Sequence, residues 1–380
     1  MNNSPSLSAG SAAPAPCILN LALQGGGSHG AFTWGVLDAL LEDGHLQLEG
    51  ISGTSAGAMN AVALAHGFAQ AAGGDHQVDP LERARESLAA FWDGVIQLGA
   101  LSEAQRAPFA LLFGHCGNQQ SSLAAIWMQA MNSFWTATVS PYQSNPLDLN
   151  PLRDFVCRHI DFERLQKISV SKYSALVPKV FVVATRVRSG KAEVFSGKRL
   201  SLDAVMASAC LPTLYKAVEI EGDHFWDGGY SGNPAIHPLI YECAARDVLL
   251  VQINPIQRDK LPTTPSEIMD RLNEVSFNAG LIAEMRAIDF VKHLLAEGRL
   301  DPTHYKDVLM HRIDGGEALE AFAASSKSST SASLIHELRD LGRAQAQAWL
   351  RRNRRALGQH STVNIKQDYL DDLRLPVQRS

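Results

Sequence analysis

One serine of this sequence is flanked on both sides by small residues. It belongs to the run Gly53-Thr54-Ser55-Ala56-Gly57, which lies between an apolar run typical of a strand and a long uncharged run typical of a helix. A tight turn from strand to helix favours Gly53 and Gly57, because larger side chains would clash with nearby backbone, and the turn exposes the serine hydroxyl. The start of the helix also directs N–H groups, including that of Ala56, at developing negative charge. We therefore predict that Ser55 is a nucleophile.

A glycine-rich loop upstream could bind the negative charge that such a nucleophile creates. Residues 17–23 are typical of a buried strand, and Gln24-Gly25-Gly26-Gly27-Ser28-His29-Gly30 follows before a helical pattern begins. Successive glycines leave their N–H groups open to an oxyanion or to a phosphate. We expect Gly25, Gly26 and Gly27 to contribute to an oxyanion hole.

The same loop also fits a dinucleotide-binding pattern, which needs to be weighed. Gly25, Gly27 and Gly30 match G-x-G-x-x-G after a strand. A dinucleotide-binding unit carries an acidic residue at the end of its second strand, whereas here that strand leads directly into Ser55. A Walker-type phosphate loop is disfavoured because no Lys-Ser/Thr pair follows the glycines.

An aspartate far downstream has the sequence context of a catalytic carboxylate. Asp227 is followed by Gly228 and Gly229, which allow a loop to approach other backbone closely. Alone, this run would be typical of a hairpin turn. Together with the serine turn and the glycine loop, it predicts that Asp227 is the general base for Ser55.

These motifs, in this order, resemble those of the patatin-like phospholipases, serine hydrolases that use a Ser–Asp dyad. The resemblance rests on Gly25 to Gly30, Gly53 to Gly57 and Asp227 to Gly229, and on the small-residue run Ala207 to Pro212. It implies lipid acyl esters as substrates, with phospholipid or lysophospholipid as the leading choice. No cofactor or metal is expected. One difference is His29, where the family usually carries arginine; a histidine has fewer donors and a variable charge.

Several alternatives stay open within this interpretation. A full triad could draw its base from His224, His237, His311 or His336. The same acyl-enzyme could serve a thioesterase or an acyltransferase. A different class is a lipid-binding protein without activity.

Composition narrows the classes of protein that remain. The chain has 380 residues, a formal net charge of −5 and 46% hydrophobic residues, which indicates a globular core and no nucleic-acid partner. Five scattered cysteines favour reduced thiols over a disulfide framework: Cys17, Cys116, Cys157, Cys210 and Cys243. The sequence contains no secretory signal and no transmembrane span, so we expect a cytoplasmic protein that can contact a membrane surface peripherally. The oligomeric state is left open.

The patterning predicts an α/β fold with three α/β/α layers and a mainly parallel sheet. We expect a tail at 1–16, a catalytic domain at 17–255, a helical C-terminal extension at 256–365 and a tail at 366–380. An apolar helical insertion is expected at about 75–150. Within it, residues 107–147 carry no charge, and the helically spaced Trp127, Met131 and Phe134 suggest either a core helix or an acyl-chain groove. Four arginines gather at the end of the last helix and predict a solvated helix end or a patch for anionic lipid: Arg351, Arg352, Arg354 and Arg355.

Overall fold

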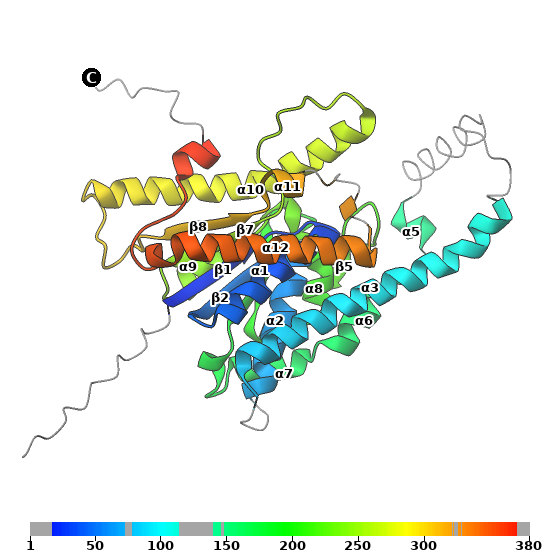
Figure 1. Ribbon diagram of the computed structural model, residues 1–380, viewed down its shortest axis with the longest axis horizontal. Helices are drawn as coiled ribbons and strands as arrows, with labels where there is room; N and C mark the ends of the chain where they lie inside the picture. Colours follow the sequence, from blue (N-terminus) through cyan, green and yellow to red (C-terminus); the bar gives the residue numbers. More distant parts are fainter. Residues whose placement is uncertain are drawn as a thin grey trace, which may run out of the picture.

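A computed structural model describes residues 17–72, 78–113, 140–145, 148–320, 322, 326–327 and 329–370. Within these residues a single sheet forms the middle layer (Figure 1). Parallel strands run in the order β3 (Lys179–Arg186), β2 (Leu46–Thr54), β1 (Cys17–Leu23), β7 (Asp247–Gln252) and β8 (Leu309–Asp314). The expected α/β class with a mainly parallel sheet is confirmed.

One edge of the sheet is antiparallel. β4 (Ala192–Ser196) and β6 (Asp223–Asp227) both pair antiparallel with β3, and β5 (Val218–Ile220) continues beyond β6. β6 pairs only with the last residues of β3, and this register places its own last residue, Asp227, opposite Ala184, two residues before β3 ends.

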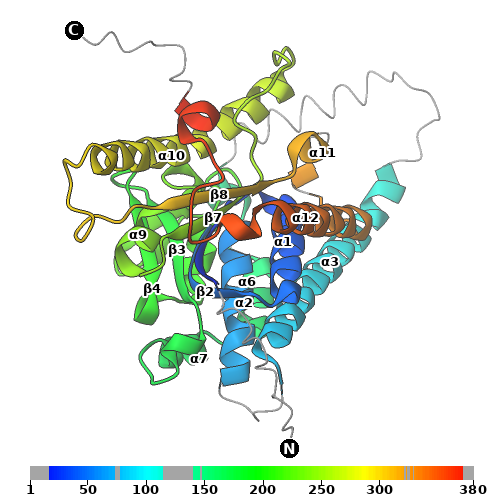
Figure 2. The same ribbon diagram turned by 60° about the vertical axis from the view of Figure 1, so that its left-hand side comes forward.

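Helices cover both faces of the sheet, as a parallel sheet requires (Figure 2). Successive side chains of a strand point to opposite faces, so Leu21 and Leu23 pack in one core and Ala22 packs in the other. The first core contains side chains of α1 (Gly30–Asp43), α2 (Ala56–Ala72), α3 (Pro80–Phe113), α6 (Pro151–His159), α7 (Phe162–Ser169), α8 (Leu202–Ser208) and α12 (Ala332–Asn353). The second contains side chains of α9 (His237–Glu242) and α10 (Pro265–Ala296).

The segment after Pro255 supplies a strand as well as the expected helices. β8 adds to the sheet beside β7, and His311 of β8 is fully buried with its Nε2 2.9 Å from Asp247 Oδ1. Polar residues interrupt the apolar pattern of β8, so its sequence gave no strand signal. Two further short α-helices are α5 (Pro141–Ser144) and α11 (Gly316–Glu320). The domain boundaries at 255 and 365 stay predictions.

Several sequence predictions fall wholly or partly beyond the described residues. They are the tail at 1–16, most of the tail at 366–380, Cys116, and the groove residues Trp127, Met131 and Phe134. Among the described helices, none combines the length and the hydropathy that crossing a bilayer would need.

Candidate active site

Ser55 occupies a strained turn between β2 and α2. Its backbone φ is 54°, in the left-handed region that non-glycine residues seldom adopt. A Cβ at Gly53 would lie 2.5 Å from the carbonyl oxygen of Gly57, and a Cβ at Gly57 would meet the carbonyl oxygen of Leu23. The turn is therefore too close-packed for side chains at either flank. The Ser55 N–H donates to Ser208 Oγ at 2.9 Å, which anchors the turn to α8.

Strand register brings Asp227 to the same level of the sheet as Ser55. Thr54 pairs with Val183 of β3, and Asp227 pairs with the next residue of that strand, Ala184. Gly228 then passes directly over β3, since a Cβ there would collide with the carbonyl oxygen of Val183. Residues 172 positions apart in the sequence thus lie on either side of one strand.

Asp227 is a buried carboxyl group with one open oxygen. Its exposed fraction is 1%, and its Oδ1 accepts a hydrogen bond from the Gly229 N–H at 2.7 Å. Its Oδ2 has no hydrogen-bond partner of regular geometry among the described residues. Burial raises the pKa of Asp227 to about 7, and the Gly229 N–H and the Ser55 hydroxyl act in the opposite direction on that pKa. An ionisable group of this kind can accept a proton near neutral pH.

Hydroxyl groups of β2 hold the loop that follows Asp227. Ser52 Oγ donates to the carbonyl oxygen of Ala235 at 2.5 Å, and Thr54 Oγ1 donates to that of Gly232 at 2.7 Å. Because Ser52 and Thr54 point to the same face of the strand, the two bonds act together on this loop.

The glycine loop packs directly on the serine turn. A Cβ at Gly25 would lie 2.7 Å from Ser55 Cβ. The Gly25 N–H already donates to Asn233 Oδ1 at 2.6 Å. By contrast, Gly26 and Gly27 donate no backbone hydrogen bond to any acceptor in the described part of the chain. Of the two residues, Gly27 is exposed and Gly26 is buried.

Three buried amide side chains fasten this loop, and the sequence did not single them out. Gln24 Oε1 accepts from the N–H groups of Ile253 and Asn254, while its Nε2 donates to the carbonyl oxygen of Asn233 at 3.1 Å. Asn254 Nδ2 donates to the Gly25 carbonyl oxygen at 2.8 Å. Isolated amides carry no spacing pattern, so only the fold reveals their shared role. Ser208, which holds the serine turn, does fall within the run Ala207 to Pro212 that carries the family resemblance.

His29 is a neutral brace for the loop. Its side chain is 2% exposed, and Nε2 lies 2.7 Å from Ser326 Oγ. Burial lowers the pKa of His29 to about 4, and the positive charges of Lys327 and Arg258 lower it further. The charge of His29 therefore does not vary near neutral pH, although variable charge is the property that distinguishes histidine from arginine.

Other candidate bases have partners elsewhere. His237 Nδ1 lies 3.1 Å from Glu284 Oε1, and His311 bonds to Asp247 and Thr362. His224 is exposed. No histidine in the described ranges forms a hydrogen bond with Ser55 or Asp227. Within those ranges, no group of three or more His, Cys, Asp or Glu side chains is placed to hold a metal ion.

Comparisons with solved structures find proteins of low sequence identity. Among solved structures, the chain is similar to VipD from Legionella pneumophila, with 18% identity and a TM-score of 0.42 over 90% of this chain and 67% of that chain. It is also similar to the heterodimeric ExoU–SpcU complex from the type III secretion system of Pseudomonas aeruginosa, with 20% identity and a TM-score of 0.32 over 90% of this chain and 61% of that chain. No curated protein matches the sequence.

The family comparison is the informative one. A family model described as patatin-like phospholipase matches residues 21–240, which is more than half of the chain. The matched segment contains the glycine loop, the serine turn and Asp227. The chain therefore belongs to the patatin-like phospholipase family and is a lipid ester hydrolase.

Proposed function

We propose that the protein hydrolyses fatty acyl esters of phospholipids or lysophospholipids through a Ser55–Asp227 dyad. The observation that carries this proposal is the open Oδ2 of Asp227, a buried carboxyl group set across one strand from a strained serine turn. A buried carboxylate with one unsatisfied oxygen is unfavourable, and such groups gather where chemistry uses them.

In the proposed reaction Asp227 accepts the hydroxyl proton as Ser55 Oγ attacks the acyl carbonyl carbon. The tetrahedral intermediate collapses, the alcohol leaves with the proton from Asp227, and an acyl-serine remains. Water then attacks the acyl-serine with Asp227 again acting as base, which releases the fatty acid. The same acyl-enzyme would serve a thioesterase or an acyltransferase, depending on the leaving group and the acceptor.

For the oxyanion we favour the N–H groups of Gly26, Gly27 and Ala56. The Gly25 N–H is bonded to Asn233, so Gly25 acts by its small size against Ser55. Ala56 begins α2, where the first N–H groups have no acceptor within the helix. Loss of one such donor typically lowers kcat by about 10²–10³.

We also propose that the protein contacts membrane surfaces through the first half of α10. Ile268, Met269, Leu272 and Val275 are exposed there. Phe277 of the same helix packs against Gly229, which places α10 beside the candidate site. The cytoplasmic location expected from the sequence stays a prediction.

A fluorophosphonate probe tests the dyad, because it labels only an activated serine. We expect the wild-type protein to be labelled and to release fatty acid from a phospholipid, and we expect Ser55→Ala and Asp227→Asn to lose both properties while melting cooperatively. The Ser55→Ala/Asp227→Asn double variant should be no slower than either single variant, because the two residues act as one unit.

Other outcomes separate the alternatives. A wild-type protein that binds lipid without labelling would be a binding protein without activity. Labelling with product formed only when an acyl acceptor or a thioester is supplied would indicate a transferase or a thioesterase. Full activity in folded Asp227→Asn would refute the dyad.

A further inference from the structure

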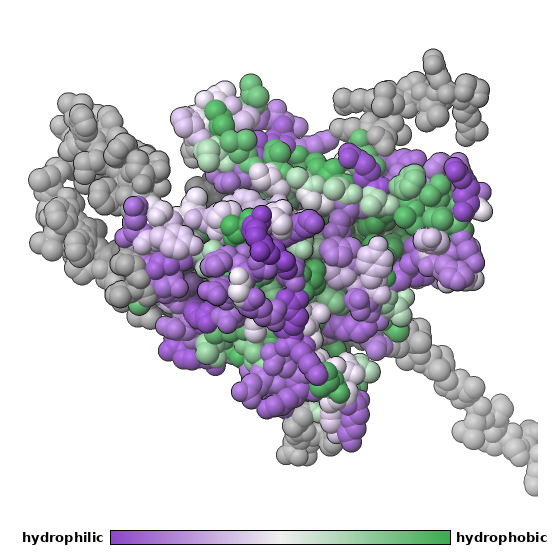
Figure 3. Space-filling model, turned by 180° about the vertical axis from the view of Figure 1, so that it is seen from behind, coloured by the Kyte–Doolittle hydropathy of each residue, from purple (hydrophilic) through white to green (hydrophobic). Residues whose placement is uncertain are grey.

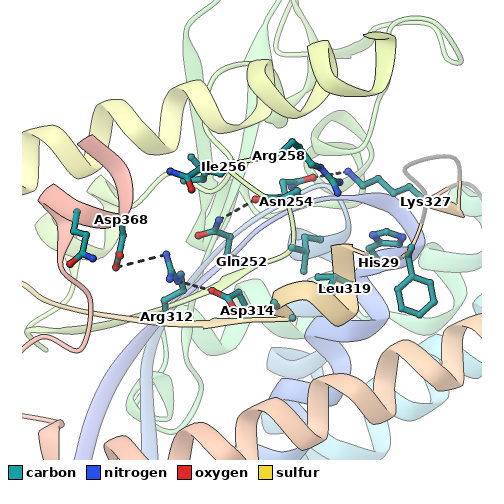
Figure 4. A pocket seen from close by; sticks show the side chains of 17 residues that line it. His29, Gln252, Asn254, Ile256, Arg258, Arg312, Asp314, Leu319, Lys327 and Asp368 are labelled. Atoms are coloured by element: carbon teal, nitrogen blue, oxygen red, sulfur yellow. Dashed lines mark hydrogen bonds and ion pairs between the residues drawn. The ribbon is translucent and has the colours of Figure 1, made fainter. Parts of the chain in front are cut away.

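A cavity of about 410 Å³ lies beside the glycine loop, at the carboxyl ends of β7 and β8 (Figure 4). Asn254, Arg258, Lys327 and His29 lie at one end of it, and Arg312 lies at the other end with Asp314 and Asp368. Apart from His29, all its lining residues follow the segment that the family model matches. The cavity is therefore a feature of this chain's C-terminal part.

The two ends of the cavity differ in how their positive charges are neutralised. Arg312 forms ion pairs with both acidic residues of its end, Asp314 at 2.8 Å and Asp368 at 4.0 Å. Arg258 at the other end pairs with Glu274 at 2.6 Å. Lys327 has no carboxylate within ion-pair distance in the described part of the chain, and its Nζ donates to the neutral Asn254 Oδ1 at 2.8 Å.

Lys327 is thus held in place by a neutral amide, and no carboxylate of the described residues is close enough to form an ion pair with it. An ammonium group has three N–H donors, and Asn254 takes one of them. Burial lowers the pKa of Lys327, the negative charges of Glu274 and Asp270 oppose this effect, and Arg258 adds to it. An anion in the cavity would both use the remaining donors and offset the two neighbouring positive charges.

A hydrogen-bond chain connects Lys327 to the candidate catalytic residues. Asn254 accepts from Lys327 and donates to the carbonyl oxygen of Gly25, and Gly25 packs against Ser55. The Lys327 backbone carbonyl also lies against Gly27. An anion on Lys327 would consequently sit next to the loop that is proposed to hold the oxyanion.

We propose that the Lys327 end of this cavity binds a phosphate group, as a monoester or a diester. A phosphate offers several acceptor oxygens to the ammonium of Lys327 and to the guanidinium of Arg258, while the acidic residues of the cavity are paired with Arg312 at the opposite end. The phosphate can belong to the head group of a phospholipid substrate, in which case the inference rests on the proposed hydrolase, or to a separate small molecule.

Calorimetric titration of the full chain with inorganic phosphate and with glycerol 3-phosphate tests the site without using activity. We expect saturable binding to the wild-type protein and at least tenfold weaker binding to Lys327→Met and Lys327→Gln, whereas Lys327→Arg keeps most of the affinity. The matched control is Lys260→Met, because Lys260 is an exposed lysine near the start of α10 that pairs with Glu267. The control should bind like the wild type. Absence of binding to the wild type, or equal binding by wild type and folded Lys327→Met, would refute the site.

Substrate comparison then identifies the source of the phosphate. With phospholipid and diacylglycerol of equal chain length in mixed micelles, a head-group site predicts that Lys327→Met lowers the phospholipid-to-diacylglycerol ratio of kcat/KM about tenfold, and that glycerol 3-phosphate raises KM for the phospholipid. A site for a separate ligand predicts an unchanged ratio and a diacylglycerol rate that depends on phosphate concentration. If the wild type hydrolysed neither substrate, the proposed function would fail, and the titration would still decide the site.

Discussion

At the scale of single residues, the strained backbone of Ser55 and the buried carboxyl group of Asp227 both lower the stability of the fold. A left-handed backbone at a non-glycine residue costs roughly 1–3 kcal/mol. The other described non-glycine residues with positive φ, Asp148 and Glu221, are exposed, whereas Ser55 is enclosed by Gly25, Gly53 and Gly57. Strain that close-packed backbone maintains is typical of a preorganised site.

The pKa of Asp227 predicts the pH dependence of the reaction. A base must be ionised to accept the serine proton, and burial places the pKa of this base at about 7. We expect kcat/KM to rise with pH through an apparent pKa near 7 and to fall about tenfold for each pH unit below 6. The profile should be measured with a soluble short-chain ester, so that vesicle charge does not change with pH. An apparent pKa near 4 would contradict the assignment of Asp227 as the buried base.

The pKa of Asp227 can also be determined from the pH dependence of protein stability, without measuring activity. Because the folded-state pKa of Asp227 is raised from 3.8 to about 7, its ionisation opposes folding as pH rises through that window. A rise of this size is worth roughly 4 kcal/mol when it is complete above pH 7. Asp227→Asn keeps an acceptor for the Gly229 N–H, so it should melt higher than wild type at pH 8, and this difference should shrink toward pH 4. A difference independent of pH would show that Asp227 does not titrate in this window.

At the scale of elements, the last long helix closes the fold by packing on the first. α12 and α1 approach so closely that a Cβ at Gly35 would meet the carbonyl oxygen of Arg339, and a Cβ at Gly342 would meet that of Phe32 (Figure 2). Ile335 and Leu338 of α12 are fully buried in the same core as α1. The helix that begins directly after the glycine loop is thus held by a helix from beyond the family-matched segment.

This packing predicts that a single methyl group at either glycine separates the two helices. We expect Gly35→Ala and Gly342→Ala each to lower the free energy of unfolding by about 1–3 kcal/mol or more, because the obstacle is backbone that cannot rotate away. Alanine is otherwise the better helix former, so propensity acts in the opposite direction. Chemical denaturation measures the change, and Ala344→Ser at an exposed position of α12 is the control. Stability equal to wild type in both glycine variants would contradict the close contact.

The elements that the sequence predicted correctly are those with local signals. The glycine loop, the serine turn and α10 each carry their pattern within a short stretch, which turn chemistry and helical periodicity determine. β8 is a strand because β7 pairs with it, and Asn233 and Asn254 matter because the chain brings them to Gly25. The partners of the two asparagines are more than two hundred positions away, and the partner strand of β8 is 62 positions away, so no local pattern predicts these roles.

At the scale of the whole molecule, two surfaces are candidates for membrane contact. One lies where the parallel strands begin and the other where they end. The arginine cluster at the end of α12 surrounds a surface hollow that also contains Asp43, and Arg354 pairs with this residue. Asp43 lies just before the start of β2, whereas Ser55 follows its end. Attachment through the arginines would therefore leave Ser55 facing away from the lipid.

Helix α10, by contrast, lies at the ends of the strands where Ser55 lies. Phe277 contacts Gly229, and Asn278 Oδ1 accepts from Gln24 Nε2 at 3.2 Å, so the middle of α10 adjoins both candidate loops. Ile268, Met269, Leu272 and Val275 fall within roughly a third of the helix circumference. Figure 3 shows hydrophobic residues over the upper part of the molecule, where α10 runs.

We therefore predict that a negative charge among the exposed apolar residues of α10 weakens binding of the enzyme to lipid surfaces. Met269→Glu and Leu272→Glu should weaken binding to phosphatidylcholine vesicles about tenfold each, since withdrawing one such side chain from lipid loses roughly 1.5–3 kcal/mol. The ratio of vesicle hydrolysis to hydrolysis of a soluble short-chain ester should fall with the binding. Leu176→Glu is the matched control, because Leu176 is 59% exposed, like Leu272 at 54%, but precedes β3 at the opposite edge of the sheet. Vesicle sedimentation measures binding, and a loss in Leu176→Glu equal to that in Leu272→Glu would contradict a specific α10 face. A different outcome is that vesicle binding disappears in an Arg351→Gln/Arg352→Gln/Arg355→Gln variant. This result would place the membrane contact where the parallel strands begin, and Ser55 could then reach lipid only after the protein leaves the surface.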